Sequence, residues 1–396
     1  MKIANAIQMC NPNLKVGLFC SPHVSSFRER MQVNGEMISE AEVVELLPQI
    51  YDWCAQHDIP ATFFEITTAL AFLFYSKRQS QVVVLETGLG GRLDATNVIQ
   101  RPAISIITSI GLEHTRILGD TVELIAAEKG GIIKEGCPVL VGPHCPQEVL
   151  QQCARERKAG RYYNPEQVLK DYRDMEITDY DEENSRISKA ALILLKHSHP
   201  DLLEGLTDAI MDQGVSVRPP CRFERVDRED GLTILLDVAH NPPAMEYLVR
   251  KLKASYPNSS FRFVTGMSSD KDLRQCSQTL LSIAGPSQIH LVEAAHPRAA
   301  KLTSILVAEP RLTDCHYNLE DRSITTQVEA AVESARENGE ILVVCGSVFL
   351  MAEAREALGF DEPRDSEYIA AMAGAGVRHG QENFGNSTVE NFPSKT

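Results

Sequence analysis

Residues 81–134 read QVVVLETGLGGRLDATNVIQRPAISIITSIGLEHTRILGDTVELIAAEKGGIIK. The stretch contains two short apolar runs, Val82 to Leu85 and Ile104 to Thr108, and each is followed by a polar loop with glycine. Such runs are typical of buried parallel strands, and the loops at the carboxyl ends of these strands bind ligands in open α/β sheets. We therefore predict an α/β fold with both runs in one parallel sheet.

Polar side chains follow the predicted strands. Glu86 comes directly after the first run, His114 lies beyond the second, and Ser21 follows a further predicted strand from Leu14 to Cys20. Because the carboxyl ends of parallel strands meet at one edge of a sheet, we expect the three side chains to lie close together.

The next helix is predicted to bring a lysine to the same edge. Asp120 is its expected N-cap, and Glu123 has the spacing of a capping box. The helix is expected to end at Lys129, because two glycines follow it.

Composition excludes several classes of protein. The 396 residues include 39 Lys and Arg against 54 Asp and Glu, a net charge of −15, which argues against a nucleic-acid surface. Ten cysteines are scattered without a C-x-x-C pair, so neither a zinc site nor a disulfide framework is indicated. No apolar run reaches the ~20 residues of a membrane span, and no signal peptide is recognised at Met1. We expect a cytoplasmic monomer that binds neither nucleic acid nor membrane.

The pattern predicts two α/β domains and a tail. Residues 1–216 form the first domain, and within it residues 162–183 are expected to be loop and 184–197 helix. The boundary follows from GVSVRPPC, a segment with two prolines and no periodicity. Residues 217–359 alternate strand and helix, as in a smaller parallel sheet covered on both faces. Residues 360–396 are rich in small and polar side chains and are predicted to be a flexible tail.

Ser21, Glu86, His114 and Lys129 form a candidate magnesium site. Mg²⁺ prefers oxygen ligands and takes few of them from the protein, so Glu86 and Ser21 suit it directly. An ammonium group would repel the metal, but carbon dioxide converts a neutral lysine amine to a carbamate, which is an oxygen anion. Taken singly, these residues have simpler interpretations: a turn for His114, and for Lys129 an exposed cation that suits the end of a helix.

A second candidate cluster lies after the boundary. Arg222 stands in PPCRFE, and Asp237, His240 and Asn241 stand in LLDVAHNPP, between a predicted strand and a helix. Arginine is always charged and matches phosphate oxygens bidentately, so Arg222 is a candidate phosphate clamp. Asp237 is placed to orient Arg222 or a ribose hydroxyl.

Together these motifs resemble the folylpolyglutamate synthase and dihydrofolate synthase family, a branch of the Mur ligase superfamily. The matching segments stand in the family's order and are SPHVSSFRERMQVNG, FFEITTALAF, LETGLGGRLDATN, GLEHTRILGDTVELIAAEKGGIIK, ENSRISKAAL, RFE, LLDVAHNP, DKD and CGSVFLMAE. GLGGRLDATN is the most specific of them. The resemblance implies a P-loop-type α/β domain joined to a smaller Rossmann-like domain, with ATP between them.

The resemblance also implies roles for individual residues. The implied magnesium ligands are a serine, a glutamate, a histidine and a carbamylated lysine, namely Ser21, Glu86, His114 and Lys129. His114 and Lys129 are also the expected catalytic residues. The residues expected to bind ATP are Arg222, Asp237, His240 and Asn241.

The implied reaction is the ATP-dependent addition of L-glutamate to a tetrahydrofolate through an acyl phosphate, with synthesis of dihydrofolate from dihydropteroate as a second activity. One rival is a non-catalytic remnant that binds folate or a partner without turning over ATP. Another is a peptidoglycan ligase of the same superfamily, which does not explain GLGGRLDATN.

The sequence departs from the family pattern in several places. The family's P-loop is expected just before the helix at Met1, and the sequence contains none; a truncated gene model is one explanation, and an organelle-targeting peptide upstream would then give a mitochondrial form. Glu113, Cys221 and Val238 stand where Asp, Gly and Gly are usual. The last two put the geometry of the nucleotide in doubt, because Gly often marks close backbone approach.

Overall fold

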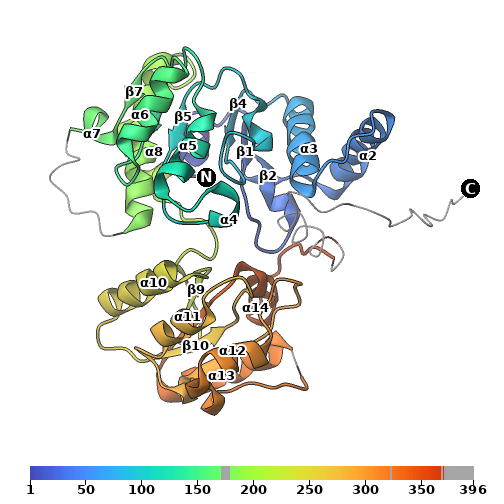
Figure 1. The fold of residues 1–396 in the computed structure, drawn as a ribbon, viewed down its shortest axis with the longest axis vertical. Helices are drawn as coiled ribbons and strands as arrows, with labels where there is room; N and C mark the ends of the chain where they lie inside the picture. Colours follow the sequence, from blue (N-terminus) through green and yellow to red (C-terminus); the bar gives the residue numbers. More distant parts are fainter. Residues whose placement is uncertain (171–178, 322, 367–368, 370–396) are drawn as a thin grey trace, which may run out of the picture.

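The computed structural model describes residues 1–170, 179–321, 323–366 and 369. These residues form two lobes, and the chain passes from the first lobe to the second between α9 (Asp208–Val215) and β8 (Glu224–Asp227) (Figure 1). Both lobes combine parallel strands with helices, which confirms the predicted α/β class.

The N-terminal lobe contains two sheets. The first has the order β3 (Glu36–Met37), β2 (Met31–Val33), β1 (Val16–Phe19) and β4 (Val82–Leu85), with β1 and β4 parallel. The second is fully parallel, with the order β5 (Ser105–Ile107), β6 (Val139–Val141) and β7 (Tyr162–Tyr163).

The prediction that the two apolar runs share one sheet is therefore wrong. The first run forms β4, at the edge of the first sheet, and the second contains β5, at the edge of the other. Within the described residues, neither strand hydrogen-bonds to a further strand on its open side, so the two edges do not join.

Helices cover both faces of the first sheet. Alternate β1 residues face opposite cores, since Leu18 packs with α1, α8 and α9 whereas Phe19 packs with α2 and α3. The helices of this lobe are α1 (Lys2–Cys10), α2 (Glu40–Gln56), α3 (Phe63–Arg78), α4 (Thr115–Leu118), α5 (Val122–Lys129), α6 (Gln147–Glu156), α7 (Pro165–Val168), α8 (Tyr180–Ser198) and α9. No helix in the described ranges is long and apolar enough to cross a membrane.

Two predicted helix starts are corrected. The N-cap of α5 is Thr121, whose hydroxyl accepts the Leu124 amide, so the predicted Asp120 and Glu123 capping box does not form. Helix α8 begins at Tyr180 and not at residue 184, because the Asp179 carboxylate caps it. The predicted loop 162–183 therefore also contains β7, α7 and the first turn of α8, and its residues 171–178 lie outside the described residues.

The C-terminal lobe has one five-stranded sheet with the order β11 (Ile289–Leu291), β10 (Phe261–Thr265), β12 (Ile341–Cys345), β9 (Thr233–Asp237) and β8. Only β8 is antiparallel, and it was not predicted. One face packs on α10 (Pro242–Ser255), α11 (Leu273–Leu280) and α12 (Leu302–Ala308), and the other on α13 (Ile324–Asn338) and α14 (Met351–Ala357). The predicted alternation of strand and helix is thus observed.

The predicted flexible tail has two parts. Residues 367–368 and 370–396 lie outside the described residues. Residues 360–365 return to the N-terminal lobe, where the Asp365 carboxylate accepts the Phe27 amide at 2.9 Å. This contact holds residues 360–365 against the N-terminal lobe. The prediction of a flexible tail is therefore wrong for these residues.

Candidate active site

Ser21 and Glu86 lie side by side because their strands do. Phe19 of β1 pairs with Leu85 of β4, so both chains leave the sheet at the same level. The Glu86 amide donates to the Phe19 carbonyl at 2.9 Å, and the Ser21 amide donates to Glu86 Oε2 at 3.1 Å. The first two predicted metal ligands are thus in contact.

The Glu86 carboxylate faces solvent but is surrounded by protein on most sides. This desolvation raises its pKa, and the Ser21 amide together with the charges of the Met1 ammonium group, Arg222 and Arg30 offsets part of the rise. Such a carboxylate gains stabilisation from a nearby divalent cation. Arg222, which contributes to this effect, belongs to the other lobe.

His114 stands at the N-cap of α4 with a left-handed backbone, φ 54°. The surrounding protein lowers the pKa of its imidazole, and among the neighbouring charges Glu113 acts in the opposite direction, whereas Lys271 and Lys129 lower it further. The ring is therefore neutral at pH 7, which is the form that binds metals. Lys129 is thus one of the charged groups that act on the His114 imidazole.

The GLGG loop fixes the end of α5, which carries Lys129. A Cβ on Gly91 would lie 2.8 Å from the Lys129 carbonyl oxygen and 2.9 Å from the Glu128 carbonyl oxygen. The Arg92 amide donates to that Glu128 carbonyl at 2.9 Å, and the Arg92 guanidinium pairs with the Glu128 side chain. Only glycine permits so close an approach, so the motif positions the lysine.

Asp94 holds the same loop from inside. Its carboxylate is buried and accepts the Gly88 amide at 2.8 Å, the Leu89 amide at 2.9 Å and the Thr96 amide at 2.9 Å. The acid of GLGGRLDATN is thus a structural acceptor.

Arg222 occupies a constrained turn at the start of the C-terminal lobe. Cys221 and Phe223 both have left-handed backbones, with φ 55° and φ 53°. In the family pattern a glycine precedes this arginine, and glycine adopts a left-handed backbone without strain. Here Cys221 adopts that conformation, and its buried thiol packs beside Arg355. The turn leaves Arg222 exposed.

Asp237 supports this turn from the end of β9. Its carboxylate accepts the Phe223 amide at 2.7 Å and the Ala239 amide at 2.8 Å. Burial raises the pKa of this carboxyl, and these bonds and Arg222 offset only part of the rise. The predicted ATP-binding residue Asp237 therefore acts, in this structure, on the backbone beside Arg222.

His240 and Asn241 follow at the start of α10. Asn241 caps the helix by accepting the Ala244 amide at 2.9 Å, and its amide nitrogen donates to Glu113 Oε1 of the N-terminal lobe at 2.9 Å. His240 Nδ1 lies 2.9 Å from the Val238 carbonyl oxygen. Asn241 thereby joins the nucleotide motif to the residue before His114.

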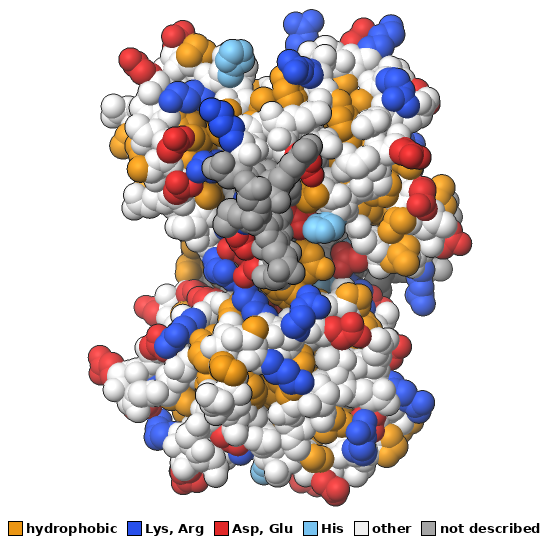
Figure 2. All heavy atoms as spheres, turned by 90° about the vertical axis from the view of Figure 1, so that its left-hand side faces the viewer, with side chains coloured by type: hydrophobic (Ala, Val, Ile, Leu, Met, Phe, Trp, Pro, Cys, Tyr) orange, Lys and Arg blue, Asp and Glu red, His pale blue; other side chains and the backbone are white. Residues whose placement is uncertain are grey.

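Two cations at the junction have no ion-pair partner in the part of the chain that the structure describes. Among the described residues, neither Lys129 nor Arg222 forms a salt bridge or a side-chain hydrogen bond. The described chain also contains no group of three or more His, Cys, Asp and Glu side chains that would bind a metal by itself. One carboxylate, one imidazole and one hydroxyl fit Mg²⁺ when phosphate and water complete its shell. The space-filling view shows acidic and basic side chains at the narrow waist between the lobes (Figure 2).

A carboxylate and an imidazole that the sequence analysis did not single out lie nearby. Glu183 of α8 is buried, with one oxygen 2.7 Å from His144 Nδ1 and the other, Oε1, without a hydrogen-bond partner. His144 follows β6, and its carbonyl accepts the Ile110 amide at the base of the His114 loop. Glu183 was predicted to end the loop 162–183, although it is also the first residue of the matching segment ENSRISKAAL. No motif indicated its partner.

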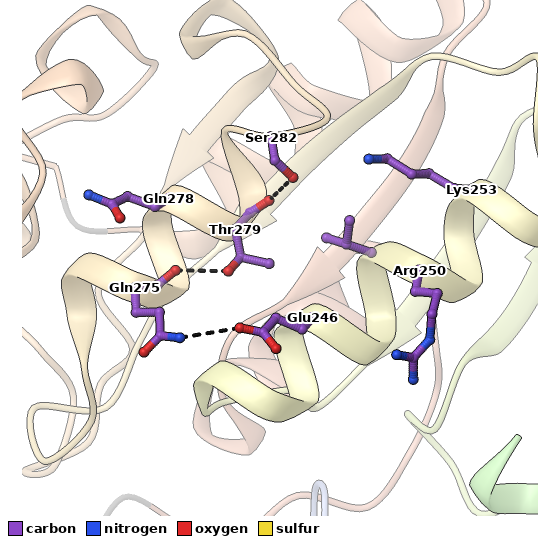
Figure 3. Close-up of a pocket in the computed structure, with 8 residues that line it drawn as sticks. Glu246, Arg250, Lys253, Gln275, Gln278, Thr279 and Ser282 are labelled. Atoms are coloured by element: carbon purple, nitrogen blue, oxygen red, sulfur yellow. Dashed lines mark hydrogen bonds between the residues drawn. The ribbon is translucent and has the colours of Figure 1, made fainter. Parts of the chain in front are cut away.

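The most evident grooves lie elsewhere. One of about 540 Å³ runs between α10 and α11, where Gln275 donates to Glu246 at 3.2 Å (Figure 3). Another of about 400 Å³ is lined by Phe223, Glu224 and Tyr256, among others. Neither is lined by a predicted magnesium or ATP ligand, so the candidate site is defined by the loops where the lobes meet.

Known proteins resemble the chain in both sequence and structure. The family model described as Mur ligase, glutamate ligase domain matches residues 221–348. A dihydrofolate synthase/folylpolyglutamate synthase of Bacillus subtilis is 31% identical over 374 residues, 87% of this chain and 84% of the relative. The structure of E. coli FolC in complex with DHPP and ADP has a TM-score of 0.73 and 28% identity, and covers 90% of this chain and 84% of that one. A bifunctional folylpolyglutamate synthase/dihydrofolate synthase with Mn, AMPPNP and L-glutamate bound has a TM-score of 0.72 and 30% identity, with 91% and 86% covered.

Proposed function

Since the chain belongs to the dihydrofolate synthase and folylpolyglutamate synthase family, we propose that it is an ATP-dependent ligase that adds L-glutamate to folates. The proposed acceptors are dihydropteroate, which gives dihydrofolate, and tetrahydrofolate, which gives the polyglutamate. Relatives of both activities support this range, since DHPP, ADP and L-glutamate are bound in the similar structures.

One observation carries the proposal. The contact between Ser21 and Glu86 lies at the carboxyl ends of β1 and β4, and Arg222 from the other lobe influences the same carboxylate. Carboxylate and hydroxyl groups on one side and a guanidinium on the other suit a metal-bound triphosphate.

The chemistry requires activation of a carboxylate. Resonance and negative charge make the folate carboxylate a poor electrophile, so its oxygen attacks the γ-phosphorus of ATP, and ADP leaves. The amine of L-glutamate then attacks the carbonyl carbon of the acyl phosphate and expels phosphate, and the amine loses a proton. The product is an amide, with ADP and inorganic phosphate.

The residues of the site have distinct parts in this scheme. Magnesium, when bound, offsets the negative charge of the phosphoryl oxygens. Ser21, Glu86, His114 and a carbamylated Lys129 would hold it. Arg222 would bind a phosphoryl oxygen of ATP, and Asp237 would keep the Arg222 turn in place through the Phe223 amide.

Glutamate-dependent release of ADP tests the proposal. With tetrahydrofolate or dihydropteroate, ATP and Mg²⁺, we expect turnover that stops when glutamate is omitted. R222A should lower kcat/KM by at least about 100-fold, whereas R225A, which removes an exposed arginine paired with Asp227, should not. A version with a P-loop segment before Met1 serves as the comparison, and absence of turnover from both folded chains would contradict the proposed activity.

A further inference from the structure

Residues 360–365, here called the C-terminal strap, cross from the C-terminal lobe to the loop that carries Ser21. The Asp365 carboxylate is nearly fully buried and accepts the Phe27 amide at 2.9 Å and the Ser26 hydroxyl at 3.0 Å. The Asp365 amide donates to the Ser25 carbonyl at 2.9 Å. One residue of the strap thus makes three hydrogen-bonded contacts with three successive residues of the loop.

His23 extends this contact towards Ser21. Its Nδ1 accepts a hydrogen bond from Arg30 Nε at 2.8 Å, so the neutral ring carries its proton on Nε2. That nitrogen lies 3.3 Å from Asp365 Oδ2. The loop is therefore held by Asp365 on one side and by Arg30 on the other, two residues after Ser21.

The other end of the strap is fixed to the C-terminal lobe by Arg355. This buried guanidinium binds Glu362 through Nε at 2.8 Å and through Nη2 at 2.5 Å, and it lies 3.9 Å from the centre of the Phe360 ring. Glu362 also accepts the Ser25 hydroxyl at 3.3 Å. Breaking a buried ion pair strongly destabilises a protein, so we expect this end of the strap to stay attached to the C-terminal lobe.

The same arginine supports the turn that carries Arg222. Arg355 Nη1 donates to Glu224 at 2.7 Å, and Glu224 Oε2 accepts the Cys221 amide at 2.8 Å. A continuous set of contacts thus runs from the residue before Arg222, through Arg355 and the strap, to the Ser21 loop.

We propose that Asp365 is a positioning residue, which holds the Ser21 loop in its metal-binding arrangement and couples it through the strap to the Arg222 turn. The role in metal binding rests on the proposed function, because it takes Ser21 as a magnesium ligand. The strap acts by restricting the loop and does not touch the reacting atoms.

Hydrogen exchange and metal binding of the full chain test this inference. The variants are D365A, which removes the acceptor of the Phe27 amide, and D365N, which keeps one acceptor oxygen. The matched control is D212N, which removes an exposed carboxylate that pairs with Lys189 and has no described contact with the strap. Amide exchange in residues 21–28 is measured by mass spectrometry, and Mn²⁺ affinity by electron paramagnetic resonance.

We expect exchange at Phe27 to be roughly tenfold to a hundredfold faster in D365A, since hydrogen bonds to a charged group are lost. The Mn²⁺ dissociation constant should rise several-fold, D365N should lie between D365A and wild type, and D212N should match wild type. Unchanged exchange in D365A would contradict the claim that Asp365 holds the Ser21 loop. Faster exchange with unchanged Mn²⁺ affinity would contradict the claim that holding this loop supports metal binding. If wild type itself binds no Mn²⁺, the proposed metal site fails, while the exchange data still decide whether the strap holds the loop.

Discussion

At the junction of the lobes, some polar side chains form hydrogen bonds within the protein, whereas others have no ion-pair partner among the described residues. Asp94 and Asp237 use their carboxylates to hold backbone amides, and Asn241 uses both ends of its amide. Lys129 and Arg222, by contrast, form no salt bridge with any described residue. The sequence predicted which residue types lie near the site, but it did not separate these two groups, because the hydrogen-bond partners come from distant or irregular segments.

Lys129 offers a test at this scale. K129A should lower kcat by at least about 100-fold, because the oxygen anion expected at this position is lost. Formate or acetate should restore part of the rate by supplying a carboxylate in the space. K158A, which removes an exposed lysine 3.9 Å from Glu135, is the control. Normal activity of K129A would rule out a carbamate there.

Glu42 gives a pH test of stability. Two hydrogen bonds from Arg78 of α3 lower the pKa of this α2 carboxyl from 4.5 to about 2. Because the folded pKa lies below the unfolded one, the contribution to stability is complete above pH 4.5 and is lost as the pH falls towards 2. E42Q should therefore lower the free energy of unfolding by about 1–3 kcal/mol at pH 7 but by much less near pH 2. An equal loss at both pH values, in denaturant titrations, would contradict the assignment.

At the scale of elements, sequence patterns predicted the strand β4 and the end of α5 at Lys129, and both agree with the structure. The alternation of strand and helix expected in the C-terminal lobe is also observed. Sheet membership was less predictable, since an apolar run does not reveal which strand it pairs with, and β4 and β5 ended in different sheets. The start of α8 was missed because its first turn is rich in acidic residues and resembles a loop.

The GLGG loop and α5 form one structural unit, which Gly91 tests. G91A should destabilise the protein by about 1–3 kcal/mol and reduce activity, because the new Cβ would press on the Glu128 and Lys129 carbonyls. G285A is a suitable control, since its nearest neighbour would be 3.8 Å away. Thermal unfolding and ADP release of both variants check this; unchanged behaviour of G91A would show that the loop does not position Lys129.

At the scale of the whole molecule, the site depends on how the lobes meet. Asp179, at the start of α8, accepts hydrogen bonds from Tyr247 and Lys251 of α10, both at 2.6 Å. Burial alone would raise its pKa, but these bonds outweigh that effect and lower it. This contact could not be predicted from the sequence, because its partners come from different lobes.

D179A should loosen the two lobes. We expect KM for ATP to rise several-fold with a smaller change in kcat, because ATP is proposed to bind between them. D212N removes an exposed carboxylate that pairs with Lys189 inside the N-terminal lobe, and it should have no such effect. A change in kcat alone would argue against a role in docking the lobes.

The central claim is that side chains from separate loops surround one divalent ion where the lobes meet. Anomalous diffraction from crystals grown with Mn²⁺ and ATP measures this directly. We predict one strong manganese peak about 2 Å from a Glu86 oxygen, with Ser21, His114 and a carbamylated Lys129 around it. A peak elsewhere, or these side chains turned away from the ion, would contradict the assignment of this site.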